Sequence, residues 1–261
     1  MVYVLSRIKC AIKADQKIAT HGKTSVFNDV AGDLDARMSK AFADRGVLVI
    51  LVDLALGPTQ LLAEAVDGYA VISDLLDTPA VSKMAANLLA QSGVLNILVN
   101  NASILSNATI ATSLKQKWRR VQDVNVDASF ILAHSFLPRM RAARWCGVIN
   151  MFSSAAKSGG LTAVTFYPGP KSAMRDDLLP RSRSSGKDRH IQRCSARQCD
   201  VTNGFRAAPR GAQRGAQLAA NLVGCFCEPE EVAHAVKVFA SRLAGFITSE
   251  VIDPNGGLHN D

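Results

Sequence analysis

Residues 47–54 read VLVILVDL, an unbroken apolar run that ends in an acid. Such a run is typical of a strand that is buried on both faces, whereas an edge strand would alternate apolar and polar residues. Just before it, ARMSKAFADRG (36–46) has helical spacing and stops at Gly46, a residue type that commonly ends helices. The stretch therefore predicts a helix followed by a buried strand.

The alternation of helices and strands continues on both sides. We expect further helices at 59–66, 78 to about 93, about 112–143 and 228 to about 243, and further strands at 69–74, 94–102, 147–156 and 246–253. Thr78 and Pro79 mark one helix start, as N-cap and first helical residue. This order predicts an α/β fold with a doubly wound, mainly parallel sheet of the Rossmann-like type, in three layers (α/β/α). In that architecture, ligands bind beyond the carboxyl ends of the strands.

Length and composition favour one domain. At 261 residues and 48% hydrophobic content, the chain can bury one sizeable core. We expect that domain to span 23–261, after an N-terminal extension (1–22) that matches no recognisable element. No apolar run reaches the roughly 18 residues that a membrane span needs, and Arg7, Lys9 and Lys13 interrupt the opening segment. The prediction is a soluble protein without a secretion signal or membrane span.

The spacing of the cysteines and the net charge limit the possible functions further. The six cysteines show no paired CxxC spacing, and Cys225-x-Cys227 has no His or second cysteine pair beside it. We therefore predict no metal site, and reduced thiols in a cytoplasm. Most of the net charge of +8 lies in 175–214, where nine Arg and one Lys against four Asp give +6.

Polar residues cluster where the expected strands end: Asp53, Asp74, Asn100, Asn101, Ala102, Ser153 and Ser154. Tyr167 follows Ser154 by thirteen residues and Lys171 follows Tyr167 by four, so Tyr167 and Lys171 fall on one face of a helix. The set SSAA and YPGPK, preceded by NNAS and DVNVD, closely resembles the short-chain dehydrogenase/reductase family. The resemblance runs, with gaps, from about residue 24 to the C-terminal PNGG.

What the resemblance implies is hydride transfer between a nicotinamide cofactor and a small alcohol or carbonyl substrate. Tyr167 would be the general acid/base, and Lys171 would favour its phenolate, because a free tyrosine has a pKa of about 10. Ser154 would hydrogen-bond the substrate oxygen, and Asn125 would support Lys171 through a water chain. Family members are commonly dimers or tetramers, so the resemblance also implies a homo-oligomer.

The resemblance further implies a set of cofactor-binding residues: Gly32, Asp53, Asp74, Asn101, Ala102, Tyr167 and Lys171. Asp53 ends the second expected strand about 20 residues beyond the phosphate turn. A carboxylate there accepts hydrogen bonds from a ribose 2′-hydroxyl and repels a 2′-phosphate, which favours NAD over NADP. Asp74 matches the family position near the adenine, although an exposed acid that caps a loop is an almost equal alternative.

The phosphate turn departs from the family pattern. In the family the first strand ends in TGxxxGxG, and the same eight positions here read NDVAGDLD (28–35), so that Asp29, Asp33 and Asp35 replace all three glycines. Glycine serves there because the turn needs unusual dihedral angles and the backbone must approach a pyrophosphate. The acids predict repulsion of a dinucleotide, or else simple capping of the following helix. Ser103 replaces the glycine of the family's NNAG, and its side chain narrows the adenine side of the expected cofactor pocket.

A second departure covers about 177–215, where no periodicity is visible. Back-translated with permitted codons and read one nucleotide later, residues 180–205 can encode the helix, strand and Pro-Gly loop that the family has at this place. We therefore hypothesise that this segment is frameshifted, either in the gene itself or through a sequencing error. As the sequence stands, we expect a flexible loop there.

Three functional classes follow from the sequence. The first is an NAD-linked oxidoreductase of the short-chain type. The second is a catalytically impaired relative that keeps the fold but not dinucleotide binding. The third and least favoured is nucleic-acid binding through 175–214, since Phe205 is the only aromatic residue interleaved with its arginines.

Overall fold

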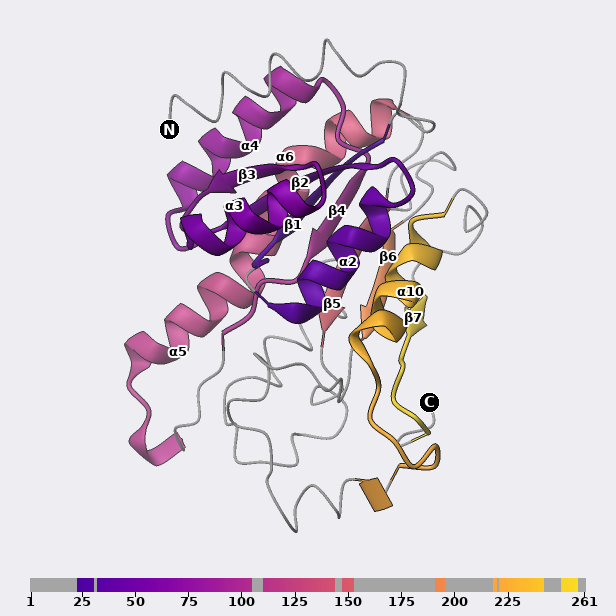
Figure 1. Cartoon of the computed structure of the whole chain (residues 1–261). Helices are drawn as coiled ribbons and strands as arrows, with labels where there is room; N and C mark the ends of the chain where they lie inside the picture. The colour runs from indigo at the N-terminus through magenta and orange to yellow at the C-terminus, as the bar shows by residue number, and fades with distance from the viewer. Residues whose placement is uncertain are drawn as a thin grey trace.

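The computed structural model describes residues 23–30, 32–104, 110–143, 147–152, 191–195, 218–219, 221–241 and 250–257 (Figure 1). Helices and strands alternate along the chain from the first described strand onward. In order they are β1 (Thr24–Asn28), α2 (Asp33–Ala43), β2 (Leu48–Asp53), α3 (Leu56–Ala65), β3 (Tyr69–Ile72), α4 (Thr78–Ser92), β4 (Ile97–Asn100), the 3₁₀ turn η1 (Ile110–Thr112), α5 (Lys115–Gln122), the π-helical turn η2 (Asp123–Asp127), α6 (Ala128–Ala142), β5 (Gly147–Phe152), β6 (Ile191–Ser195), α10 (Pro229–Phe239) and β7 (Val251–Ile252).

The described strands form one seven-stranded sheet in the order β3-β2-β1-β4-β5-β6-β7, and every pairing is parallel. The order reverses beside β1, which pairs with β2 on one side and with β4 on the other. Asn28 lies opposite Asn100, and Asn100 lies opposite Asn150, so the three asparagines lie side by side across β1, β4 and β5. The predicted doubly wound α/β fold is confirmed.

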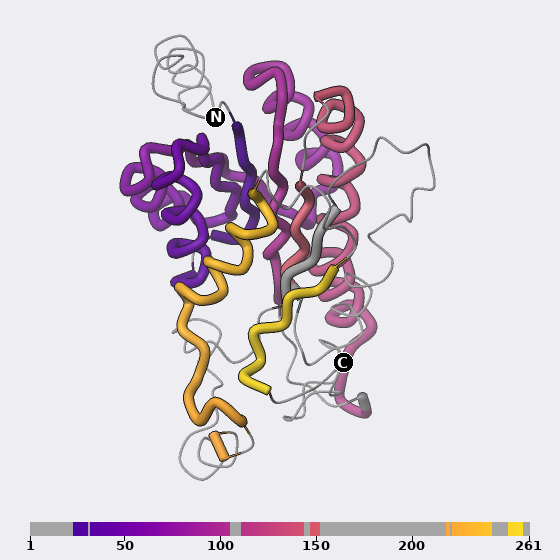
Figure 2. The backbone as a smooth tube through the Cα atoms, turned by 90° about the vertical axis from the view of Figure 1, so that its right-hand side faces the viewer, coloured from indigo at the N-terminus to yellow at the C-terminus, as the bar shows by residue number. Residues whose placement is uncertain are grey.

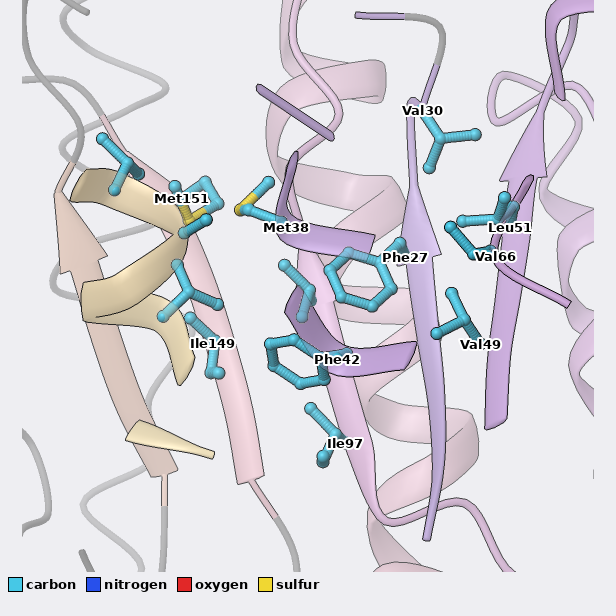
Figure 3. Close-up of a cluster of buried hydrophobic side chains, with 14 of the residues drawn as sticks. Phe27, Val30, Met38, Phe42, Val49, Leu51, Val66, Ile97, Ile149 and Met151 are labelled. Atoms are coloured by element: carbon cyan, nitrogen blue, oxygen red, sulfur yellow. The ribbon is translucent and has the colours of Figure 1, made fainter. Parts of the chain in front are cut away.

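Helices cover both faces of the sheet, and each face has its own hydrophobic cluster. On one face, α2, α3 and α10 pack on the sheet around Phe27, Phe42 and Val236. The rings of Phe27 and Phe42 meet edge to face, 5.1 Å apart, and Figure 3 shows both between β1 and α2. On the other face, α4 and α6 pack around Val26 and Phe136. Both clusters draw on the apolar runs that predicted the buried strands.

Helix α10 lies beside α2 although about 200 residues separate them in sequence (Figures 1 and 2). It begins at Pro229 with a capping box, in which Glu228 and Glu231 exchange side-chain and backbone hydrogen bonds. It ends at Phe239, earlier than the predicted Leu243. An exposed ion pair, Arg37–Glu230 at 3.0 Å, joins the two helices.

Other predicted boundaries also differ from the observed ones, and two of them have a clear physical reason. The N-cap of α4 is Asp77, whose side chain accepts a hydrogen bond from the backbone N–H of Ala80 at 3.0 Å, so Thr78 is already helical. Aspartate caps at least as well as threonine, and it precedes the proline by two residues. The long helix expected at 112–143 is interrupted by η2, because one turn there widens to the π-helical pattern.

The sequence predicted a loop across 177–215, and this prediction is wrong for Ile191–Ser195. These residues form β6, which pairs in parallel with β5 from Val148 to Phe152. Backbone hydrogen bonds to a neighbouring strand can hold a strand whose side-chain pattern is uninformative. The strand falls within 180–205, the stretch that can encode the family's helix, strand and Pro-Gly loop in the alternative reading frame, and the frameshift stays a prediction.

Several predictions lie outside the described residues. They concern the extension 1–22, most of 177–215, and the catalytic candidates Ser154, Tyr167 and Lys171. None of the helices in the described ranges is both long enough and apolar enough to cross a bilayer.

Candidate active site

Three asparagines tie the carboxyl ends of β1, β4 and β5 together. The Nδ2 of Asn28 donates to Oδ1 of Asn100 at 2.9 Å, and the Nδ2 of Asn100 donates to Oδ1 of Asn150 at 2.8 Å. All three side chains are at most 1% exposed. No acceptor among the described residues meets the Nδ2 of Asn150. This asparagine ladder holds the strand ends in register at the edge where ligands of such sheets bind.

Asn28 also fixes the loop that follows β4. Its Oδ1 accepts the backbone N–H groups of Asn101 at 2.8 Å and Ala102 at 2.7 Å. Ala102 is fully buried, and Asn101 is half-buried. The structure thus places Asn101 and Ala102 at the predicted edge, directly beside the turn after β1.

Among the described residues of that turn, Asp29 is the one whose backbone conformation favours glycine. Its φ is +61°, in the left-handed region that non-glycine residues adopt at a cost. Its N–H donates to the carbonyl of Val52 at 2.9 Å. Its Oδ2 accepts the N–H of Ser103 at 3.1 Å, and its carbonyl accepts from Nδ2 of Asn101 at 3.2 Å. The Asp29 side chain is therefore turned toward the loop after β4.

Asp33 and Asp35 stand in the first turn of α2, with Gly32 as the N-cap at an ordinary extended φ of −103°. Neither acid is the N-cap itself, because Gly32 occupies that position. Both acids still face the positive end of the helix dipole, which is favourable by about 0.3–1 kcal/mol each. Asp35 is 5% exposed, and its Oδ1 accepts from Nδ2 of Asn101 at 2.6 Å. Two carboxylates, those of Asp29 and Asp35, therefore bind the β4 loop to the turn.

Asp53 closes β2 and orders the backbone around it. Its Oδ2 accepts the N–H of Val30 at 2.7 Å, and its Oδ1 accepts the N–H of Ala55 at 2.9 Å. The residue is 8% exposed. Charge-assisted bonds of this kind are short and strong, so the carboxylate is held in place between the turn after β1 and the start of α3.

Asp74 follows the last residue of β3 by two residues, at the same edge of the sheet, and is exposed. Its Oδ1 accepts the N–H of Leu76 at 2.9 Å, which closes a local turn. The preceding residue, Ser73, donates its N–H to the carbonyl of Asp53 at 3.0 Å. The loop-capping alternative for Asp74 is thus realised, and its position at the site edge is compatible with the family role as well.

Asn125 is fully buried in the π-helical turn η2. Its Oδ1 accepts the N–H of Ile104 at 2.8 Å, and its Nδ2 donates to the Ile104 carbonyl at 3.1 Å. This two-point contact joins η2 to the chain after β4. π-Turns are often found at functional sites because they re-aim one side chain within a helix. Because it contacts Ile104, which follows β4, Asn125 lies at the same edge of the sheet as the asparagine ladder.

An acid in the same turn, Asp127, has a shifted pKa. Burial raises the pKa of Asp127 above its ordinary value, and the neighbouring Asp123 raises it further, while Arg119 lowers it in part. Holding this carboxylate ionised beside Asp123 costs the folded state some stability.

Sequence reasoning missed the asparagine ladder. The signal was present, because VFN (26–28), LVN (98–100) and VIN (148–150) place asparagine at the same point of three strands. The contacts of Asp29 and Asp35 with the β4 loop had no such signal, since they join residues far apart in sequence.

The family model described as "Enoyl-(Acyl carrier protein) reductase" matches residues 36–259. The chain is 26% identical over 249 residues to an uncharacterized short-chain type dehydrogenase/reductase of Sinorhizobium fredii, covering 91% of this chain and 97% of the relative. The chain belongs to the short-chain dehydrogenase/reductase family.

Other family members show the range of activities among relatives. The chain is 24% identical to a 3-oxoacyl-(acyl-carrier-protein) reductase of Aquifex aeolicus, over 93% of this chain and 99% of the relative. It is 26% identical to a meso-2,3-butanediol dehydrogenase of Serratia marcescens, over 90% and 94%.

Solved structures agree on the fold. A short-chain dehydrogenase/reductase from Brucella melitensis superposes with a TM-score of 0.82 at 20% identity, covering 94% of this chain and all of the other. A putative NAD(P)-dependent gluconate 5-dehydrogenase from Beutenbergia cavernae, with bound NADP, superposes with a TM-score of 0.81 at 24% identity, covering 92% and 98%. The predicted family is confirmed, and family members use nicotinamide dinucleotides.

Proposed function

We propose that this chain is an oxidoreductase of the short-chain dehydrogenase/reductase type that transfers hydride between NAD(H) and a small alcohol or carbonyl substrate. The single observation that carries the choice of NAD is the Asp53 carboxylate, which two backbone amides hold at the end of β2. A fixed acid at this place suits a ribose 2′-hydroxyl and repels a 2′-phosphate.

Two parts of the edge differ in how well they suit a dinucleotide. The adenosine side fits, because Asp53, Ala102 and the loop before Asp74 line the edge of the sheet. The pyrophosphate turn does not fit, because carboxylates stand at Asp29, Asp33 and Asp35 and two of them bond to the β4 loop. When bound, NAD would supply the hydride acceptor.

The proton chemistry of the proposal rests on this chain's own residues. Tyr167 takes the proton of the substrate hydroxyl during oxidation and returns it during reduction. Lys171 favours the tyrosine phenolate, and Ser154 orients the substrate oxygen. Asn125 is the one member of this group that lies among the described residues, and its buried contact with Ile104 supports a positioning role.

The second candidate is a relative that keeps the fold without binding a dinucleotide. The specific observation in its favour is that Asp29 and Asp35 accept hydrogen bonds from Ser103 and Asn101. Those donors face the turn that in the family receives phosphate. A turn whose own carboxylates occupy such donors leaves fewer of them for a ligand.

Titration with NADH and with NADPH, followed by calorimetry, separates the two candidates. The first predicts micromolar NADH binding, weaker NADPH binding, and a loss of that preference in an Asp53→Asn variant. The second predicts no heat with either dinucleotide. Equal affinity for both cofactors, unchanged in Asp53→Asn, would contradict the role given to Asp53.

The proposal also includes a reducing, cytoplasmic setting and a homo-oligomer. Cys225 and Cys227 are free thiols, which suits a reducing compartment. Phe130 on α6 is 58% exposed and its ring stacks on His134 at 5.9 Å. Such an exposed aromatic face on a long helix suits contact with a second copy.

A further inference from the structure

A cavity of about 310 Å³ lies at the amino edge of the sheet, opposite the edge that carries the proposed dinucleotide site. Its apolar walls are Phe42 at the end of α2, Val47 before β2, Ile97 at the start of β4 and Ala240 after α10. Figure 3 shows Phe42 and Ile97 at the end of the hydrophobic cluster that is far from Val30 and the phosphate turn. The cavity therefore has an apolar floor formed by the core itself.

Its polar walls are cationic. Lys23, Arg45 and Lys237 line the cavity together with Ser241, and no acidic residue is among the lining residues. The ion pairs nearby, Arg37–Glu230 and Lys40–Asp44, do not include Arg45 or Lys237. Within the described ranges, no carboxylate forms an ion pair with Arg45 or Lys237. Three positive groups thus converge on one concave, partly apolar surface.

Helix dipoles alone explain only part of this arrangement. Cations are favoured near helix C-termini, and the cavity lies between the ends of α2 and α10. Each end carries about half a negative charge, however, and turn amides already cap its carbonyls. Asp44 and Gly46 donate to the carbonyls of Lys40 and Ala43, while Ala240 and Ser241 donate to those of Val236 and Val238. Arg45 and Lys237 therefore bring more positive charge than the two helix ends offset.

We propose that this cavity is a binding site for a small amphipathic anion, namely a carboxylate on a short apolar chain. The carboxylate lies between Arg45 and Lys237, and the apolar chain lies on Phe42 and Ile97. A guanidinium matches a carboxylate through two parallel hydrogen bonds. The volume is at the lower end of the roughly 300–1,000 Å³ of ligand pockets, which suits a short chain. Inorganic phosphate would leave the apolar floor unused.

The test is calorimetric titration of the full chain with octanoate at low ionic strength, with 1-octanol as the uncharged probe of equal length. We expect saturable octanoate binding at one site that weakens with added salt, and at least tenfold weaker octanol binding. Octanol binding as tight as octanoate, or no octanoate binding, would overturn the proposal.

Matched variants locate the site. Arg45→Met/Lys237→Met keeps the apolar stems, removes two charges and should weaken octanoate binding at least tenfold. Lys83→Met/Arg139→Met removes two exposed charges elsewhere and should leave binding unchanged. Equal loss in both variants would mean a general charge effect and would refute the site. Ala240→Leu reduces the cavity without changing charge, and it provides the same test if the first double variant unfolds.

Competition separates this site from the dinucleotide edge. Octanoate should bind with the same affinity in the presence and absence of saturating NADH, because the two sites lie at opposite edges of the sheet. Displacement of octanoate by NADH would place the anion at the carboxyl edge and would contradict the proposal. Since octanoate binding is measured directly, this result does not depend on whether NADH binds at all.

Discussion

The carboxyl and amino edges of the sheet carry opposite side-chain charges. Asp29, Asp33, Asp35 and Asp53 gather at the carboxyl edge, and Lys23, Arg45 and Lys237 gather at the amino edge. Helix N-termini point toward the first edge and C-termini toward the second, so each set complements the helix dipoles. The charges that suit the fold are thus the reverse of those that suit a phosphate ligand at the carboxyl edge. The comparison shows that helix stability and dinucleotide binding make opposing demands on the same turn.

The largest expected effect comes from removing the acids of the carboxyl edge. One unit-charge repulsion at about 4 Å and an effective dielectric of about 20 is about 4 kcal/mol. The variant Asp29→Gly/Asp33→Gly/Asp35→Gly should therefore bind NADH up to about a thousandfold more tightly, as measured by calorimetry. Its stability should fall somewhat, because the bonds to Ser103 and Asn101 are lost.

A single pair of variants separates charge from backbone strain in that experiment. Asp29 and Asp67 are the two described non-glycine residues with positive φ, at +61° and +49°. Asp29→Gly and Asp67→Gly should relieve similar strain, but only Asp29→Gly should raise NADH affinity. A similar gain in both variants would show that the charge at the turn is not what limits binding.

The next prediction compares two asparagines, Asn28 at the carboxyl edge of the sheet and Asn96 at the amino edge. Asn28 accepts two backbone amides and donates to Asn100 in a fully buried position, so Asn28→Ala should lower the free energy of unfolding by about 2–4 kcal/mol. Asn96 accepts one amide, that of Thr24 at 3.0 Å, and is half-buried, so Asn96→Ala should cost about 1 kcal/mol. Urea unfolding measures both. Equal losses would mean that the asparagine ladder adds nothing beyond one hydrogen bond.

The smallest effect concerns Asp127 in η2. Its pKa is raised in the folded chain, so the folded state binds this proton more tightly than the unfolded state, and stability falls as pH rises through the raised pKa. Asp127→Asn should therefore be slightly more stable than the parent at neutral pH. The difference should vanish as pH falls below the ordinary aspartate value. Thermal unfolding at several pH values checks this, and a difference that grows toward acid pH would contradict it.

The sequence predicted those parts of the fold in which local pattern and tertiary environment agree. VLVILVDL became β2 because both of its faces are covered by helices. The predicted end of α2 at Gly46 is wrong, because α2 ends at Ala43 with Asp44 as C-cap, although Gly46 has the positive φ that favours glycine after a helix. Asn125 was found by resemblance, and its burial against Ile104 agrees with a structural reason for that residue.

The remaining features depend on distant contacts. The π-turn η2 has no signature in composition, because it differs from an α-helix by one hydrogen-bond register. β6 forms from residues without a strand pattern, because its neighbours β5 and β7 supply the pairing. Asp35 was expected to repel a dinucleotide or to cap the following helix, and neither expectation included the contact of its carboxylate with Asn101, 66 residues away in the sequence.

The asparagine ladder has a consequence for synthesis of the chain. Asn28 and Asn100 are 72 residues apart. At about 5–20 residues per second, a ribosome needs roughly 4–14 s to make that interval. During this time β1 can pair with β2, but its other edge stays open to pairing with a neighbouring nascent chain. The last step that protects the central strand is thus the arrival of β4, and slow translation between residues 54 and 96 would lengthen the period of exposure to aggregation.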